Sequence, residues 1–314
     1  MRQRRQRSVF VRPMLATLID KPFDDSAWVF ETKWDGFRIV ARIDRGKVTL
    51  YSRNGKKVSE RYPSIVQALS KINHDAVIDG ELVALDRRGR SRFQLLQNAL
   101  RTSARLRYCA FDLMFLDGRD MRKLPLLNRK AALKRILPAG NIVRFSRHRV
   151  ENGTRFFKQA RKAGEEGIMG KRSASIYRSG VRSRDWLKIK TGWEQEAVIV
   201  GFTRPQRSRK YFGSLALAVR DGKRWRYIGH VGTGFDATSL RAIHAKLAPL
   251  KTAAKPFDQK VKYEAQTTWV RPKLVGEVKF TEWTARGEMR HPAFLGLRDD
   301  KRAADVIMER SGRV

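Results

Sequence analysis

The sequence predicts two domains, an α+β domain followed by a smaller all-β barrel domain. Up to Lys190, stretches with the two-residue alternation of β-strands are interspersed with stretches of helical spacing. Beyond Gly192, short strands predominate and a single helix is expected. A chain of 314 residues is also long enough to form two hydrophobic cores. We place the boundary between residues 1–193 and residues 194–314.

The expected elements of the first domain follow an irregular, basic lead-in over residues 1–25. Strand alternation then surrounds a turn at Arg45 and Gly46. Ser64 is expected to cap a short helix, and Gly164 is expected to end the last helix of the domain. The other expected strands are residues 76–85, 108–116, 168–172 and 186–190, and the other expected helices are residues 93–100, 128–136 and 154–163.

The second domain is expected to be an oligonucleotide-binding (OB) barrel. Five or so short strands with one helix in a basic segment of this length are typical of that fold. The expected strands are residues 197–202, 215–220, 225–231 and several within 269–283, and the expected helix is residues 239–247.

The charge balance indicates the kind of partner. The chain carries 68 Lys and Arg against 31 Asp and Glu, a net charge of +37. Such an excess predicts an extended polyanion bound with strong salt dependence. Nucleic acid is favoured over a membrane surface, because the sequence has no basic amphipathic helix with a clean apolar face. The basic residues run through the whole chain, with one short cluster at Arg2, Arg4, Arg5 and Arg7.

Composition also limits location and cysteine chemistry. No apolar stretch is long enough to span a membrane, and no secretory signal follows the basic N-terminus, so an intracellular protein is expected. The single cysteine, Cys109, lies in an apolar run and is expected to be a core residue. It cannot form a disulfide within the chain, and no Cys/His zinc pattern is present.

Lys33 is the candidate nucleophile. A lysine with an ordinary pKa of about 10.4 is protonated and unreactive. Lys33 lies among aromatic residues, including Phe30 and Trp34, and close to Arg38, and both desolvation and like charge disfavour an ammonium. The pattern Lys-x-Asp-Gly is short, however, and a type I turn with a solvated lysine is the alternative.

Two carboxylates stand where local structure does not require them. Glu81 interrupts an apolar strand, and Glu166 follows a helix end, where acids are disfavoured by the helix dipole. A metal or ribose contact would explain both residues, since cations bound to phosphates take one or two protein carboxylates. The alternatives are an edge-strand glutamate facing water and a solvated turn.

Three other stretches are candidates for binding. Lys188 and Lys190 share one face of a strand, where a phosphate would relieve their repulsion; a solvated basic face is the alternative. Phe111 could stack on a base, although an aromatic residue in a strand is usually core. The stretch from Arg290 to Lys301 could hold a leaving pyrophosphate, or it could be a surface loop.

Taken in order, these stretches resemble the motifs of the covalent nucleotidyltransferases, and most closely those of the ATP-dependent DNA ligases. The resemblance runs from about Pro13 to Lys301. It is closest to bacterial ligases of the end-joining type, including the ligase part of multifunctional repair ligases. The matching stretches are Lys33-Trp34-Asp35-Gly36, Ser52-Arg53-Asn54-Gly55, Asp79-Gly80-Glu81-Leu82, Phe111-Asp112, Glu166-Gly167-Ile168-Met169, Leu187-Lys188-Ile189-Lys190 and the stretch from Arg290 to Lys301.

The resemblance implies a nucleotidyltransferase (adenylation) domain in which Lys33 attacks the α-phosphate of ATP and becomes lysyl-N-AMP. It implies that Glu31 recognises the edge of adenine and that Phe111 stacks on its face. The other implied contacts to ATP or AMP are Thr32, Arg38, Arg53, Glu81, Glu166, Lys188 and Lys190, of which Glu81 and Glu166 also serve the divalent metal.

More specific roles follow from the same resemblance. Lys188 and Lys190 would hold the α-phosphate, and Arg38 and Arg53 would bind the sugar or the 5′-phosphate of a nick. Residues 191–196 are the candidate hinge for a closing barrel. The residues expected to act on pyrophosphate in the first step are Arg290, Arg298 and Lys301.

The resemblance also implies the cofactors and partners. ATP and Mg²⁺ or Mn²⁺ are expected, with nicked or broken double-stranded DNA as substrate in DNA repair and recombination by non-homologous end joining. A Ku-type end-binding protein is a possible partner. A monomeric, stand-alone ligase in the bacterial cytoplasm is expected, associated with the nucleoid through DNA binding.

Two other functions are also compatible with the sequence. An RNA ligase or an mRNA capping guanylyltransferase would use the same lysine chemistry. A non-catalytic DNA-binding barrel protein would leave Lys33, Glu81, Lys188 and Lys190 without a role. An NAD-dependent ligase is not expected, because the sequence has no extra N-terminal nicotinamide-binding segment and no zinc cysteines.

Overall fold

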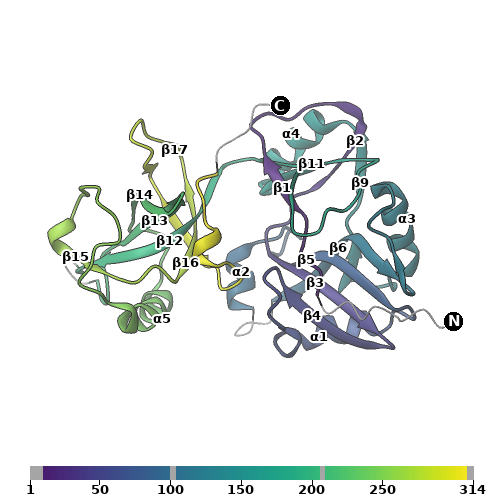
Figure 1. Cartoon of the computed structure of the whole chain (residues 1–314), viewed down its shortest axis with the longest axis horizontal. Coiled ribbons are helices and arrows are strands. Elements are labelled where there is room, and N and C mark those ends of the chain that lie inside the picture. Colours follow the sequence, from purple (N-terminus) through teal and green to yellow (C-terminus); the bar gives the residue numbers. More distant parts are fainter. Residues whose placement is uncertain (1–9, 100–103, 206–208, 310–314) are drawn as a thin grey trace. The chain divides into compact units, whose positions relative to one another are not determined.

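The computed structural model describes residues 10–99, 104–205 and 209–309 (Figure 1). These residues form two compact units, one ending at Thr191 and the other spanning Gly192–Glu309. The sequence places the boundary slightly later, after residue 193. The basic cluster at Arg2, Arg4, Arg5 and Arg7 lies outside the described residues. Within the described ranges, no helix has the length and apolar character needed to span a bilayer.

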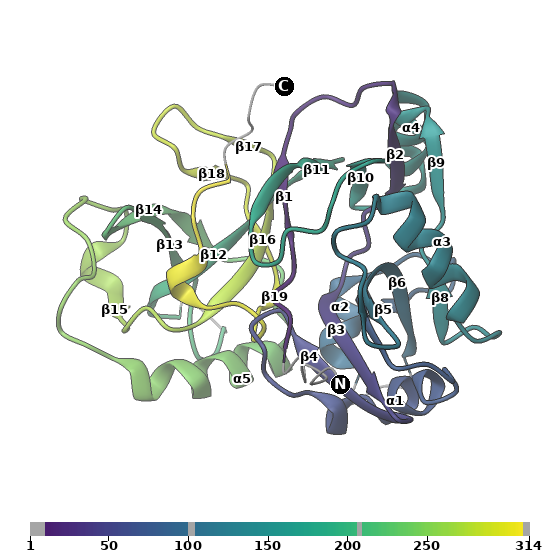
Figure 2. The same ribbon diagram turned by 45° about the vertical axis from the view of Figure 1, so that its right-hand side comes forward.

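The first unit contains two sheets, of which sheet 1 carries the strand before Lys33. Its strand order is β1-β11-β10-β2-β9; β1 runs parallel to β11 and the other neighbours are antiparallel. Helix α4 (Gly153–Ala163) packs on one face through a buried cluster that includes Phe30 and Ile168 (Figure 2). The strands are β1 (Leu15–Leu18), β2 (Asp25–Thr32), β9 (His148–Glu151), β10 (Gly167–Arg172) and β11 (Arg182–Lys190).

Sheet 2 has the order β4-β3-β5-β6-β7, with β8 paired to β6. Apolar residues from its strands and from α1 and α3 form one core, which includes Leu50, Ile65 and Leu133. Cys109 lies on β6 with 1% of its surface exposed, and burial raises the pKa of its thiol to about 12, so it is an inert core residue as predicted. The elements are β3 (Phe37–Asp44), β4 (Lys47–Ser52), α1 (Pro63–Leu69), β5 (Ala76–Leu85), α2 (Phe93–Asn98), β6 (Arg105–Leu116), β7 (Arg119–Asp120), α3 (Leu126–Ile136) and β8 (Val143–Phe145).

Most of the predicted elements are confirmed in this unit, but two local predictions are wrong. The lead-in is not irregular throughout, because Leu15–Leu18 forms β1 and pairs with the distant strand β11. Ser64 does not cap α1; the cap position is Tyr62, and Pro63, whose fixed φ suits the first helical turn, starts the helix. Gly164 does end α4, with a left-handed φ of 68°.

The second unit is a six-stranded sheet with one α-helix. Its order is β14-β13-β12-β16-β19, with β15 also paired to β12. Just beyond the end of β14, Thr233 forms an isolated parallel bridge with Ala293 of β19, and the N–H of Phe294 donates to the carbonyl of Thr233 at 2.9 Å. The elements are β12 (Trp193–Thr203), β13 (Leu215–Asp221), β14 (Arg224–Val231), α5 (Ala237–Leu247), β15 (Thr267–Trp269), β16 (Val275–Phe280), the hairpin β17 (Glu282–Trp283) and β18 (Met289–Arg290), and β19 (Ala293–Leu297).

The predicted architecture, an α+β domain followed by an all-β barrel domain, is confirmed by these two topologies. Asp236 caps α5 and accepts from the N–H of Ser239 at 2.7 Å. Thr191 and Gly192 connect β11 to β12, and the rest of the predicted hinge lies within β12. Short 3₁₀ turns lie at Ser59–Arg61, Ala248–Leu250, Glu264–Gln266 and Ala303–Asp305.

Candidate active site

Lys33 lies just beyond the end of β2. Its backbone N–H donates to the carbonyl of Gly167 at 3.0 Å, and its ammonium forms an ion pair with Glu166. The two side chains are 17% and 7% exposed, so water screens this pair only partly. The Lys33 turn and the stretch around Glu166, which the sequence analysis selected separately, are therefore in contact.

The turn after Lys33 is held by specific contacts. The carboxylate of Asp35 accepts from the N–H of Phe93 at 2.9 Å, and Trp34 packs beside Val83 and Cys109. A Cβ at Gly36 would overlap backbone of the neighbouring strand β5, so only glycine fits there. These contacts fix the Lys-x-Asp-Gly turn in place, and the alternative of a simple solvated turn is not supported.

The register of sheet 1 sets which side chains share the face of Lys33. Residues paired across neighbouring strands project to the same side of a sheet. Thr32 pairs with Ile168, which pairs with Ile189, and this row faces the apolar core under α4. The rows on the opposite face are Lys33, Gly167 and Lys190, and Glu31, Met169 and Lys188.

Glu31 is 1% exposed and is held between two ammonium groups. Its Oε1 lies 2.8 Å from the Nζ of Lys130 and 3.2 Å from the Nζ of Lys171. Burial alone would raise the pKa of Glu31, but the two cations outweigh it and the pKa is lowered. Burial lowers the pKa of Lys171 to about 8 despite Glu31. The Lys171 ammonium also lies 4.3 Å from the ring centres of both Phe111 and Trp186.

Arg38 contacts Phe111 from a second direction, with its guanidinium 4.6 Å from the ring centre. Its Nε and Nη2 each donate to a carboxylate oxygen of Asp79 at 2.6 Å, and the hydroxyl of Tyr177 donates to the same carboxylate at 2.6 Å. Burial would lower the pKa of Arg38, but Asp79, with a smaller effect from Glu81, raises it. Arg38 is thus a permanent cation fixed beside the predicted stacking residue.

The residues present fit a nucleotide and a divalent metal. The described part of the chain has no group of three or more His, Cys, Asp or Glu side chains able to hold a metal by themselves. Mg²⁺ bound together with a nucleotide needs only one or two carboxylates, because phosphate oxygens and water complete its shell, and Glu81 and Glu166 can supply these. Among the residues that the structure describes, Nδ1 of His148 and Nε1 of Trp186 are buried without a hydrogen-bond partner, as expected near a site for a polar ligand.

In the second unit, Arg298 and Lys301 form one network with acids. The guanidinium of Arg298 donates to both oxygens of Asp300, at 2.8 and 2.9 Å, and also pairs with Glu277. The ammonium of Lys301 lies 2.5 Å from Glu196. Burial would raise the pKa of Glu196, but Lys301 and Arg298 outweigh it and the pKa is lowered. The two predicted phosphate-binding cations are thus held together by carboxylates in this structure.

The structure also places three further predicted residues. Arg290 is exposed on β18 and pairs with Glu282 at 2.6 Å. Arg53 lies, half-buried, in the turn after β4. Thr32 projects to the core side of sheet 1, as its row shows.

The structure also adds residues that the sequence analysis missed. Lys130 and Lys171 bind the buried Glu31, and Asp79 binds Arg38. For Lys130 a signal was present: it lies four residues after Leu126 and three before Leu133, both fully buried, so a charge interrupts the apolar stripe of α3.

Comparison with known proteins places the chain in a family. Residues 13–190 match the family described as "ATP dependent DNA ligase domain", and residues 208–301 match "ATP dependent DNA ligase C terminal region". The chain therefore belongs to the ATP-dependent DNA ligase family. The resemblance and the two-domain fold predicted from the sequence are confirmed, and the DNA ligase interpretation is supported over an RNA ligase or capping enzyme.

Proteins named LigD are among the relatives of this chain. The chain is 39% identical over 311 residues to "Multifunctional non-homologous end joining protein LigD" of Pseudomonas aeruginosa, and the match covers 96% of this chain and 37% of that protein. It is 36% identical over 303 residues to the LigD protein of Mycolicibacterium smegmatis, covering 95% of this chain and 39% of that protein. The chain thus spans less than half the length of these relatives.

Among solved structures, the chain matches one described as "mycobacterial DNA ligase D complexed with ATP and MES" with a TM-score of 0.71 and 34% identity. That match covers 96% of this chain and 99% of the other. The ligase domain of LigD from M. tuberculosis matches with a TM-score of 0.55 and 35% identity, again over 96% of this chain and 99% of the other. ATP is the nucleotide of this family, as predicted.

Proposed function

We propose that this chain seals 5′-phosphate/3′-hydroxyl breaks in double-stranded DNA through a lysyl-N-AMP at Lys33. The observation that carries the proposal is the position of Lys33, which is paired with Glu166 in the same row as Lys190. One carboxylate and one or more cations at the nucleophile are what a phosphoryl transfer to nitrogen requires, because positioning and charge neutralisation do most of the work in such reactions.

The reaction would run in three transfers. The Nζ of Lys33, after losing a proton, attacks the α-phosphorus of ATP; a P–N bond forms and the bond to pyrophosphate breaks. An oxygen of the DNA 5′-phosphate then takes the AMP from Lys33. Finally the 3′-hydroxyl attacks the 5′-phosphorus, AMP leaves, and a phosphodiester bond forms. A bound divalent metal would neutralise phosphate charge during these steps.

The side chains on the Lys33 face suggest their roles. Lys188 and Lys190 would hold the α-phosphate, since a strand face with two ammoniums suits an anion. Glu31 would accept from the amino group of adenine and Phe111 would stack on the ring. Thr32, whose side chain faces the core, would contribute through its backbone.

The remaining contacts to the nucleotide and DNA would come from cations and acids of both domains. Glu81 and Glu166 would serve the metal or the ribose. Arg38 and Arg53 would bind the sugar or the 5′-phosphate. Arg298 and Lys301, with Arg290, would act on pyrophosphate in the first step after exchanging their carboxylate partners for phosphate. A hinge at residues 191–196 would allow this, with 1–193 as the adenylation domain and 194–314 as the OB-fold domain.

The relatives support a role in repair. The proteins named above are described as non-homologous end joining proteins, so we propose broken DNA as the substrate, a Ku-type protein as a possible partner and a monomeric state. A bacterial cytoplasmic location, with the chain held at the nucleoid by DNA, fits its net charge of +37.

Label transfer tests the proposal. The protein, first treated with pyrophosphate to discharge any bound AMP, is incubated with Mg²⁺ and ATP labelled at the α-phosphate and run on a denaturing gel. A labelled band is expected in wild type and in Lys47→Ala, a surface control, and none in Lys33→Ala. Nicked DNA should discharge the band. Labelling of Lys33→Ala, or no labelling of wild type, would refute the function.

A further inference from the structure

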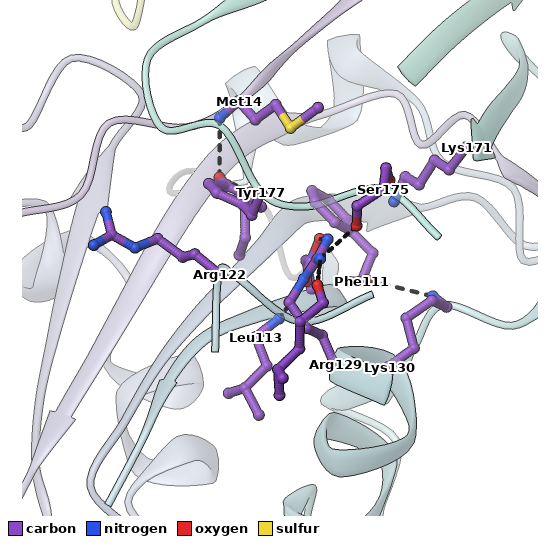
Figure 3. Close-up of polar contacts among 12 residues, drawn as sticks. Met14, Phe111, Leu113, Arg122, Arg129, Lys130, Lys171, Ser175 and Tyr177 are labelled. Atoms are coloured by element: carbon purple, nitrogen blue, oxygen red, sulfur yellow. Dashed lines mark hydrogen bonds and ion pairs between the residues drawn. The ribbon is translucent and has the colours of Figure 1, made fainter. Parts of the chain in front are cut away.

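Lys130, which lies outside both motifs, hydrogen-bonds to the two residues proposed to hold the base, Glu31 and Phe111. Lys130 lies on α3 and is 1% exposed. Its Nζ lies 2.8 Å from the carboxylate of Glu31. It also lies 3.3 Å from the carbonyl oxygen of Phe111 (Figure 3). A third acceptor, the carbonyl of Ser146, lies at 3.0 Å.

An ammonium has three N–H donors, and these three acceptors use all of them. Lys130 therefore fixes Glu31 on sheet 1 and Phe111 on sheet 2 relative to each other from a single point. The ring of Phe145, with its centre 4.5 Å from the ammonium, packs against another side of the Lys130 ammonium group. A full set of partners in a buried position leaves the ammonium no freedom to act on a ligand itself, so its effect must pass through the residues that it holds.

We infer that Lys130 is a positioning residue that gives the site its preference for adenine over guanine. The inference rests on the proposed function, in which Glu31 accepts from the exocyclic amino group of adenine. Guanine presents a carbonyl oxygen at the equivalent place, which a fixed carboxylate repels. A site that matches the hydrogen-bonding pattern of adenine rejects guanine only if its polar groups cannot move. Glu31 must therefore stay ionised and must not rotate away from the base.

The neighbouring residue Arg129 provides a control for substitutions of Lys130. Arg129 is also a fully buried cation on α3, but it donates to Asp112, at 2.7 and 2.9 Å. It also donates to the carbonyl of Ser175 (Figure 3). No contact in the described residues joins Arg129 to Glu31. A substitution there tests the general cost of disturbing a buried cation on this helix.

The test measures equilibrium binding of ATP and of GTP to the whole chain, freed of AMP, in EDTA so that no transfer to Lys33 occurs. In Lys130→Met the ratio of ATP to GTP affinity should fall about tenfold, the worth of a hydrogen bond to a charged group. Glu31→Gln should lower the ratio similarly. The double variant should be no worse than Glu31→Gln, because Lys130 acts through Glu31. Arg129→Lys should lower the melting temperature and leave the ratio unchanged.

An unchanged ratio in folded Lys130→Met, or effects that add in the double variant, would overturn the inference. If Lys130→Met does not fold, the double variant Glu31→Gln/Lys130→Met, which buries no unpaired carboxylate, is compared with Glu31→Gln. A lower ratio of ATP to GTP affinity in the double variant than in Glu31→Gln would then contradict the inference. Failure of the proposed function is distinct, since wild type would then neither prefer ATP nor become labelled at Lys33.

Discussion

Lys171 is a buried lysine whose pKa lies close to neutral pH because burial disfavours its charged form. Its ammonium is 2% exposed and is stabilised by Glu31 and by the faces of Phe111 and Trp186. Burial nevertheless dominates and lowers its pKa from 10.5 to about 8. The same carboxylate also binds Lys130, so the charge on Glu31 is compensated from two sides.

The lowered pKa of Lys171 predicts a pH dependence of stability. Between pH 8 and 10.5 the unfolded chain keeps this proton and the folded chain has released it, so the contribution of Lys171 to the free energy of unfolding rises with pH. The slope is at most about 1.4 kcal/mol per pH unit. Urea unfolding at several pH values should show wild type gaining stability relative to Lys171→Met over this window.

The exposed Lys47 gives the control, since Lys47→Met should follow wild type at every pH. Parallel curves for wild type and Lys171→Met between pH 8 and 10 would contradict a lowered pKa.

At the scale of elements, the pairing of β10 with β2 and β11 brings Lys33 and Lys190 into one row. Gly167 starts β10 with a positive φ of 155°, and a Cβ there would overlap the carbonyl oxygen of Ile189 on β11. It also accepts the backbone hydrogen bond of Lys33. Glycine at this position therefore lets the three segments approach closely enough for Lys33, Glu166 and Lys190 to gather.

Gly167→Ala is accordingly expected to lower the free energy of unfolding by about 3 kcal/mol or more, because the strand must move away from β11. Gly46→Ala is the matched control: Gly46 also has a positive φ, 78°, but a Cβ there meets nothing, so only the backbone strain of about 1 kcal/mol applies. Chemical denaturation compares the two. Equal losses would show that the contact with Ile189 is not limiting.

At the scale of the whole molecule, the net charge of +37 dominates the interaction with DNA. Each phosphate neutralised by Lys or Arg releases counterions, so binding weakens with salt in proportion to the number of contacts. In the proposed first step, the adenylation of Lys33, only ATP and a metal take part. The two halves of the reaction should therefore respond differently to ionic strength.

We expect affinity for nicked DNA to fall roughly a thousandfold between 50 and 200 mM salt if about six phosphates are contacted. Adenylation of Lys33 should change far less over the same range. Filter binding and label transfer at matched salt concentrations measure both. A DNA affinity that does not depend on salt would contradict a binding mode dominated by phosphate contacts.

Local pattern predicted the order of the two domains and the turn at Lys33, and the resemblance of short motifs predicted the family. The Lys33 turn, the alternation of Lys188 and Lys190 with buried Leu187 and Ile189, and the Gly164 helix end all depend on neighbours in sequence, and each is present in the structure. Such features are readable because strand and helix periodicities act over a few residues.

Only the tertiary structure decided how the site is held. Glu31 and its partner Lys130 are 99 positions apart, and Arg38 and Asp79 are 41 apart. Strand β1 was not predicted from the sequence, because it is defined by its parallel pairing with the distant strand β11. These contacts arise when separate sheets and helices pack, and a charge that is removed from water then needs a partner that no local pattern identifies.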